Sequence, residues 1–97
     1  MALFKIFRAR EWADFEAAGR FAGSADDLRD GFIHLSTGEQ LDGTLGRHFA
    51  GETGLVVAEV GVADDSALKW EVSRGGALFP HLYRALEQAD LLGHERR

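Results

Sequence analysis

The chain has 97 residues, which predicts one domain over residues 1–97, and its 45% hydrophobic and 28% charged content is ordinary for a globular protein. Eleven basic against sixteen acidic residues give a net charge of -5, which argues against non-specific nucleic-acid binding. No cysteine is present, which excludes disulfides, thiolate metal sites and cysteine nucleophiles and fits a reducing cytoplasm. The N-terminus has no signal-peptide pattern and no run approaches the roughly 20 apolar residues of a membrane span, so a cytoplasmic protein without membrane contact is expected.

The predicted elements mix strands with fewer helices. In chain order we expect a strand at 3–8, a helix at 10–18, a capped turn at 25–28, a strand at 31–36, a helix at 38–49, strands at 55–60 and 68–72, a glycine-rich loop at 73–81, and short closing strands at 82–86 and 91–94. This pattern predicts an α+β domain with a mainly antiparallel, twisted sheet.

Local signals refine several elements. Trp12, Phe15 and Ala18 lie three positions apart and form one apolar face of the helix expected at 10–18. Ser24 is a candidate N-cap, with Asp26 and Asp27 as charges suited to a helix start. Thr37 and Gln40 match a capping box. Gly43 and Gly46 weaken the helix that follows and suggest that another group packs closely against it. In the alternating strand 68–72, Trp70 is expected to be a core residue.

The stretch GFIHLST at 31–37 carries the first candidate site. Strand alternation places His34 and Ser36 on the face opposite Ile33 and Leu35, which are the natural core residues. Thr37 lies where the strand meets a helix N-terminus, which favours phosphate or carboxylate. One interpretation is that these groups bind a ribose-phosphate. The other is that His34 only hydrogen-bonds a backbone carbonyl and Ser36 only caps a turn.

The stretch SRGGALFPHLY at 73–83 carries the second candidate site, and we expect its histidine to share one pocket with His34. The paired glycines permit a ligand to approach the backbone closely. The planar guanidinium of the arginine can bind phosphate through two N–H groups, and the proline restricts the backbone of the segment. A plain turn remains the alternative. The candidate binding residues here are Arg74, Gly75, Gly76, Phe79, His81 and Tyr83.

Glu71 is either a catalytic carboxylate or an ion-pair partner of Arg74. His48 and His94 are interpreted as surface residues. His34, His81 and Glu71 lack a short-range ligand spacing, so no metal is expected.

Three motifs resemble the small bacterial domain of unknown function family 952 (DUF952): DGFIHLST at 30–37, RHFAG at 47–51 and WEVSRGGALFPHLYRAL at 70–86. The likeness runs from KIFRAREW to about Leu86, whereas residues 87–97 depart from the pattern and their structure stays open. The resemblance implies a split sheet with two or three helices, similar to ADP-ribosyltransferases and RNA 2'-phosphotransferases.

The resemblance also implies a ligand. ADP-ribosyltransferases hold NAD in a cleft of a split sheet, so NAD, ADP-ribose or a related phosphorylated nucleoside is the expected small-molecule partner. His34, Glu71 and His81 are the candidate catalytic residues for chemistry at the nicotinamide-ribose bond. The late glutamate of those enzymes has no clear match, so a non-catalytic nucleotide- or protein-binding module is an alternative. A two-histidine phosphoesterase, using His34-Leu35-Ser36 and His81-Leu82-Tyr83, is a second alternative.

Overall fold

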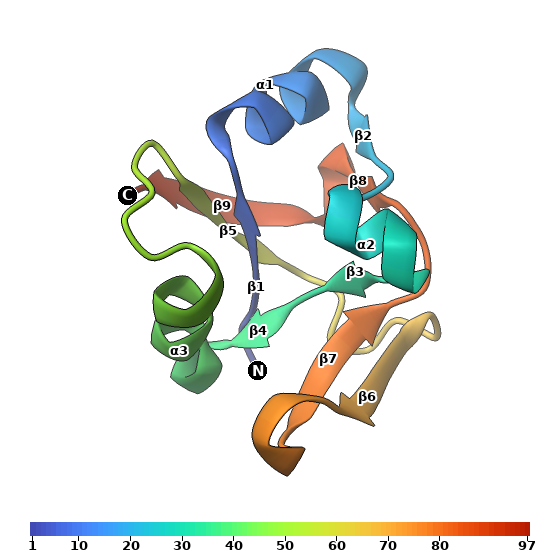
Figure 1. Ribbon diagram of the computed structural model, residues 1–97. Coiled ribbons are helices and arrows are strands. Elements are labelled where there is room, and N and C mark those ends of the chain that lie inside the picture. The colour runs from blue at the N-terminus through green and yellow to red at the C-terminus, as the bar shows by residue number, and fades with distance from the viewer.

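The structure is a computed structural model that describes residues 1–97 apart from the side chain of Arg74 (Figure 1). Helices and strands alternate irregularly, as expected for an α+β domain. The elements are β1 (Leu3–Phe7), α1 (Ala9–Ala18), β2 (Arg20–Phe21), α2 (Ala25–Asp30), β3 (Ile33–His34), β4 (Ser36–Thr37), α3 (Gly38–His48), β5 (Val56–Val60), β6 (Leu68–Val72), β7 (Leu78–Leu82), β8 (Leu86–Glu87) and β9 (Leu91–Arg96), with short 3-10 turns at Arg74–Gly76 and Gln88–Asp90.

The larger sheet has the strand order β4-β1-β5-β9 and is antiparallel throughout. The nearly continuous apolar run of β5 lies at its centre because that strand is covered on both faces. β9 pairs with β5 as far as Arg96, so the C-terminal residues form a longer closing strand than the expected 91–94.

A second sheet, called the smaller sheet below, has three strands in the order β3-β7-β6 and is also antiparallel, and β2 and β8 form a separate two-stranded pair. The strand expected at 31–36 is divided at Leu35: β3 pairs with β7, whereas β4 pairs with β1 in the other sheet. Pro80 explains the division. Its carbonyl accepts a hydrogen bond from the Leu35 amide at 3.1 Å, but proline has no N–H to return one. The chain therefore crosses from one sheet to the other at this point (Figure 1).

An aromatic cluster fills the main core. Phe7 contacts the rings of Trp12, Phe15 and Phe21, with ring centroids 4.9 to 5.6 Å apart. The spacing of Trp12 and Phe15 turns one face of α1 onto the sheet, as predicted. A second apolar cluster beneath α3 contains Ile6, Leu41, Leu55 and Val57. Among the described residues, no helix has the length and apolar character needed to cross a bilayer.

Three local expectations were wrong. The segment 73–81 is not a continuous loop, because β7 begins at Leu78 and contains the proline. Trp70 is 39% exposed, since it lies where β6 and β7 extend beyond the cover of the main core. Gly43 and Gly46 have open space beside them, so no close contact explains these glycines.

The residues 82–86 do not form one strand either. Leu82 ends β7, Arg84 lies between strands, and Leu86 begins β8, which pairs with β2. Arg84 lies at the interruption, where its guanidinium binds the carboxylates of Asp65 and Asp90, each at 2.8 Å.

Candidate functional site

The candidate site is organised around Asp27, a buried carboxylate with 2% exposure. Ser24 caps α2 as predicted, because its hydroxyl accepts from the Asp27 amide and the Asp27 carboxylate accepts from the Ser24 amide at 2.9 Å. The same carboxylate also accepts from Lys5 Nζ at 2.9 Å and from the His34 amide at 3.1 Å. Asp27 therefore connects α2 to β1 through Lys5 and to β3 through the His34 amide.

Burial by itself would raise the pKa of Asp27, because a carboxylate loses hydration in the interior. The hydrogen bond from His34, the positive charge of Lys5 and the backbone amide of Ser24 outweigh that effect. Together they hold the pKa of Asp27 well below its usual range. The carboxylate is consequently a fixed negative charge next to His34.

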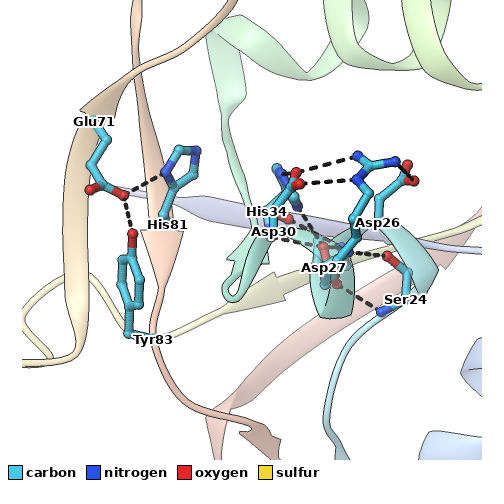
Figure 2. Close-up of polar contacts among 10 residues, drawn as sticks. Ser24, Asp26, Asp27, Asp30, His34, Glu71, His81 and Tyr83 are labelled. Carbon is cyan, nitrogen blue, oxygen red and sulfur yellow. Dashed lines mark hydrogen bonds and ion pairs between the residues drawn. The ribbon is translucent and has the colours of Figure 1, made fainter.

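His34 lies between two carboxylates (Figure 2). Its Nδ1 is 2.7 Å from Asp27 Oδ1, and its Nε2 is 3.0 Å from Asp30 Oδ2. Arg29 also binds Asp30, with Nε 3.0 Å from Oδ1. Both ring nitrogens are therefore engaged by carboxylates, which fixes the orientation of the His34 ring.

His81 is held differently. Its side chain is 6% exposed and its Nδ1 is 2.8 Å from Glu71 Oε1. The Tyr83 hydroxyl donates to the same oxygen at 2.7 Å (Figure 2). The Tyr83 hydrogen bond, followed by that of His81, lowers the pKa of Glu71, and Glu71 in turn raises the pKa of Tyr83. Because Glu71 engages Nδ1, it leaves Nε2 of His81 for proton transfer or ligand binding.

The two histidines are direct cross-strand neighbours. The register pairs His34 of β3 with His81 of β7, and their ring centroids are 5.6 Å apart. Phe32 stacks on the His81 ring at 3.9 Å and contacts His34 at 4.6 Å. The Tyr83 ring lies 5.3 Å from Phe32 and completes an aromatic surface on this face of the smaller sheet.

A cavity of about 430 Å³ opens beside this face, where the two sheets, α2 and α3 meet. His34, His81 and Ser36 are among its lining residues. Among the described side chains, four basic and four acidic ones also line it, although the chain as a whole is acidic: Lys5, Arg8, Arg29 and Arg47, and Glu11, Asp26, Asp27 and Asp30. The cavity is thus far less negative than the rest of the molecule.

The remaining predicted residues divide into two groups. Ser36 and Phe79 line the cavity, and the Ser36 hydroxyl is 3.0 Å from that of Thr44. Glu71 and Tyr83 lie outside the lining, behind His81. Thr37 caps α3 in the predicted box with Gln40 and also lies outside it.

Gly75 and Gly76 form an exposed turn with φ values of 69° and 79° and do not line the cavity. The side chain of Arg74 lies outside the described part of the chain.

Sequence reasoning did not name Asp27, Lys5 or Phe32 as site residues, although alternation along the strand places Phe32 on the same face as His34. Asp27 was interpreted only as a capping charge, which it is, but its contacts with Lys5 and His34 are a second role. A lysine within the apolar run LFKIF is a signal that was present, because a buried lysine requires a buried anion. His48, interpreted as a surface residue, is exposed but lines the cavity.

The arrangement supplies a histidine fixed between two carboxylates, a second histidine whose orientation is set by a glutamate, and aromatic rings beside both. Together with the arginines of the cavity lining, these groups can bind an anion, stack on a planar ring and accept a proton. Among the described residues, no three histidine, aspartate or glutamate side chains are grouped as ligands for a metal ion.

Comparisons with known proteins agree over most of the chain. The family model described as "Protein of unknown function (DUF952)" matches residues 6–93. The X-ray crystal structure of protein CC0527 from Caulobacter crescentus is 46% identical, with a TM-score of 0.94, covering 99% of this chain and 85% of that one. The solution NMR structure of CC0527 is 47% identical, with a TM-score of 0.88, covering 98% and 83%. No curated protein matches the sequence.

Proposed function

Because the chain belongs to the DUF952 family, whose description assigns no activity, we propose a function from the site itself. The cavity binds a phosphorylated nucleoside, with NAD and ADP-ribose as the leading candidates. In this proposal the domain is ADP-ribosyltransferase-like, and its four-stranded and three-stranded antiparallel sheets, with a cavity between them, support that assignment.

The observation that carries the proposal is the placement of His34 and His81 side by side at the cavity wall. In this proposal His34 orients the ribose, and the arginines of the cavity lining donate N–H hydrogen bonds to phosphate. Phe79 offers a ring against which a base can stack. Phosphate and a flat ring are the two recognition elements of a nucleotide.

If the bound nucleotide is turned over, the reaction breaks the bond between nicotinamide and the ribose carbon. An acceptor oxygen forms the new bond to that carbon, nicotinamide leaves as a neutral ring, and the acceptor proton passes to His81 Nε2. Glu71 orients His81 in this scheme because its carboxylate is already engaged by His81 and Tyr83. Glu71 is then a positioning residue.

Amide NMR of the isotope-labelled protein, titrated with NAD, ADP-ribose and 5'-AMP, tests the proposal. We expect shifts at residues 31–36 and 78–83, and an affinity at least about tenfold weaker (~1.4 kcal/mol) in His34→Ala. His94→Ala is the control, since that ring contacts Trp12, away from the cavity. Unchanged spectra at millimolar ligand, or unchanged affinity in His34→Ala, would rule the proposal out.

The opposed histidines also favour a second candidate, a two-histidine phosphoesterase. His34-Leu35-Ser36 matches a His-x-Ser half-motif, but His81-Leu82-Tyr83 has a tyrosine where a serine or threonine is expected. In such an enzyme one histidine accepts a proton from the attacking water and the other protonates the leaving oxygen. Release of a phosphomonoester from a 2',3'-cyclic nucleotide would support this candidate, whereas nicotinamide release would support the first.

Saturable nucleotide binding without turnover would make the protein a non-catalytic binding module. That outcome retains the proposed ligand and removes the proposed reaction.

A further inference from the structure

β6 is an edge strand whose outer side is open. Among the described residues, β7 is the strand that pairs with it, and no other strand lies beyond β6 (Figure 1). An open edge presents unpaired N–H and C=O groups that can pair with another chain.

The backbone bonds around the hairpin show which groups point outward. At its two ends, the Tyr83 amide donates to the Ala67 carbonyl at 2.8 Å, and the Ser73 amide donates to the Ala77 carbonyl at 2.9 Å. The odd-numbered residues of this segment therefore direct their backbone N–H and C=O groups toward β7. Trp70, by alternation, directs its N–H and C=O toward the open edge.

Pro80 gives independent support for this assignment. It is the register partner of Trp70, and its carbonyl accepts from Leu35 on the side away from β6. Trp70 and Pro80 are thus a pair without mutual hydrogen bonds, which again leaves the Trp70 backbone groups facing outward. Val72 follows the same alternation.

The open edge carries apolar side chains. Trp70 is 39% exposed, Val72 is 69% exposed, and the register partner of Val72, Leu78, is 53% exposed. Lys69 and Glu71 lie on the opposite face of the same strand. The edge therefore has one apolar face and one face with a single charge of each sign.

We propose that the partner of β6 is β6 of a second copy, paired antiparallel about a two-fold axis at Trp70. This register places Trp70 opposite the partner's Trp70, where each N–H can donate to the other's C=O. It also places Leu68 opposite the partner's Val72. The two small sheets then form one continuous sheet with a shared apolar face.

The charges of Lys69 and Glu71 favour this register over the other positions of the two-fold axis. With the axis at Trp70, Lys69 faces the partner's Glu71 and Glu71 faces the partner's Lys69, in pairs whose Cα atoms approach to about 4.5 Å. An axis at Lys69 or at Glu71 would place like charges directly opposite each other, which is destabilising. An axis at Val72 would leave both charged residues without an opposite charge.

The pairing also reaches the candidate site. Glu71 holds both His81 and Tyr83, and the partner's Lys69 would lie beside that carboxylate. Association would therefore add a cation next to the residue that orients His81. Two edge strands bury a small area, so we expect a weak, concentration-dependent dimer.

Sedimentation equilibrium tests the proposal without any nucleotide, so its outcome is independent of the proposed function. We expect the average mass to rise from the 10.6 kDa of the monomer toward twice that value as the concentration is raised into the millimolar range. Val72→Pro removes an outward N–H and should abolish the rise. Val72→Thr, which keeps the N–H and the strand preference, should retain it.

Charge reversal identifies the register. Lys69→Glu and Glu71→Lys should each weaken association by at least about tenfold (~1.4 kcal/mol), and the double variant should restore it because the pairs are reciprocal. Amide NMR of each variant confirms that it remains folded. A protein that stays at 10.6 kDa throughout, or a dimer indifferent to Val72→Pro and to both charge reversals, would overturn the proposal.

Discussion

His34 and His81 are register partners on β3 and β7, and each presents its Nδ1 to a carboxylate from a different element. Asp27, which fixes His34, is buried in α2, whereas Glu71, which fixes His81, lies at the margin of the smaller sheet. The two rings are therefore adjacent but held differently. Carboxylates engage both ring nitrogens of His34, whereas Glu71 engages Nδ1 of His81.

Replacing Asp27 should unfold the junction between α2 and the sheets. In Asp27→Asn, Lys5 is left as a buried cation without its anion, which costs about 3–5 kcal/mol in the free energy of unfolding. Urea denaturation measures this loss. Asp26→Asn is the matched control, because Asp26 is exposed and its ion pair with Arg29 should contribute at most ~1 kcal/mol. Equal effects of the two substitutions would contradict the central role of Asp27.

Acid should destabilise the protein through the same residue. The pKa of folded Asp27 is lowered from its ordinary value of 3.8, so its stabilisation is present above that value and is lost as the pH falls toward the folded pKa. We expect the free energy of unfolding of the wild type to fall more steeply between pH 5 and pH 3 than that of Asp27→Asn. Parallel pH profiles of the two proteins would show that Asp27 is not responsible.

Tyr83→Phe should raise the pKa of Glu71 toward its ordinary value of 4.5, because the Tyr83 hydroxyl is the main cause of its lowering. The phenylalanine ring retains the packing against Phe32. Carboxyl carbon NMR over a pH titration measures the shift, and the other glutamates in the same spectra should titrate as in the wild type. No change at Glu71 would show that the hydroxyl does not bind it in solution.

Much of the fold was predictable wherever the signal was local. The cap at Ser24, the box of Thr37 with Gln40, and the helical face of Trp12 all depend on residues within four positions of one another. Local patterns of this kind are encoded by the 3.6-residue period and by capping chemistry. The structure confirms them within one or two residues.

The remaining features depend on contacts that no local pattern encodes. The division of the strand at Leu35 results from Pro80, 45 positions later, and the second role of Asp27 results from Lys5, 22 positions earlier. The alternating pattern at 68–72 predicted a strand correctly, but alternation does not reveal which face of a strand is covered, so Trp70 was assigned to the core although it is exposed. The sequence placed both histidines in one site but did not reveal how each is held.

The glycines of α3 provide a final prediction. Gly43 lies inside the helix with no atom within 4 Å of an added Cβ, so Gly43→Ala should stabilise the protein by up to about 1 kcal/mol. Thermal unfolding should show a midpoint several degrees higher. Gly23→Ala is the contrasting control: its φ is 137° and an added Cβ would lie 2.7 Å from Asp27 Cβ, so the midpoint should fall. A lower midpoint for Gly43→Ala would show that α3 needs this glycine for a reason other than packing.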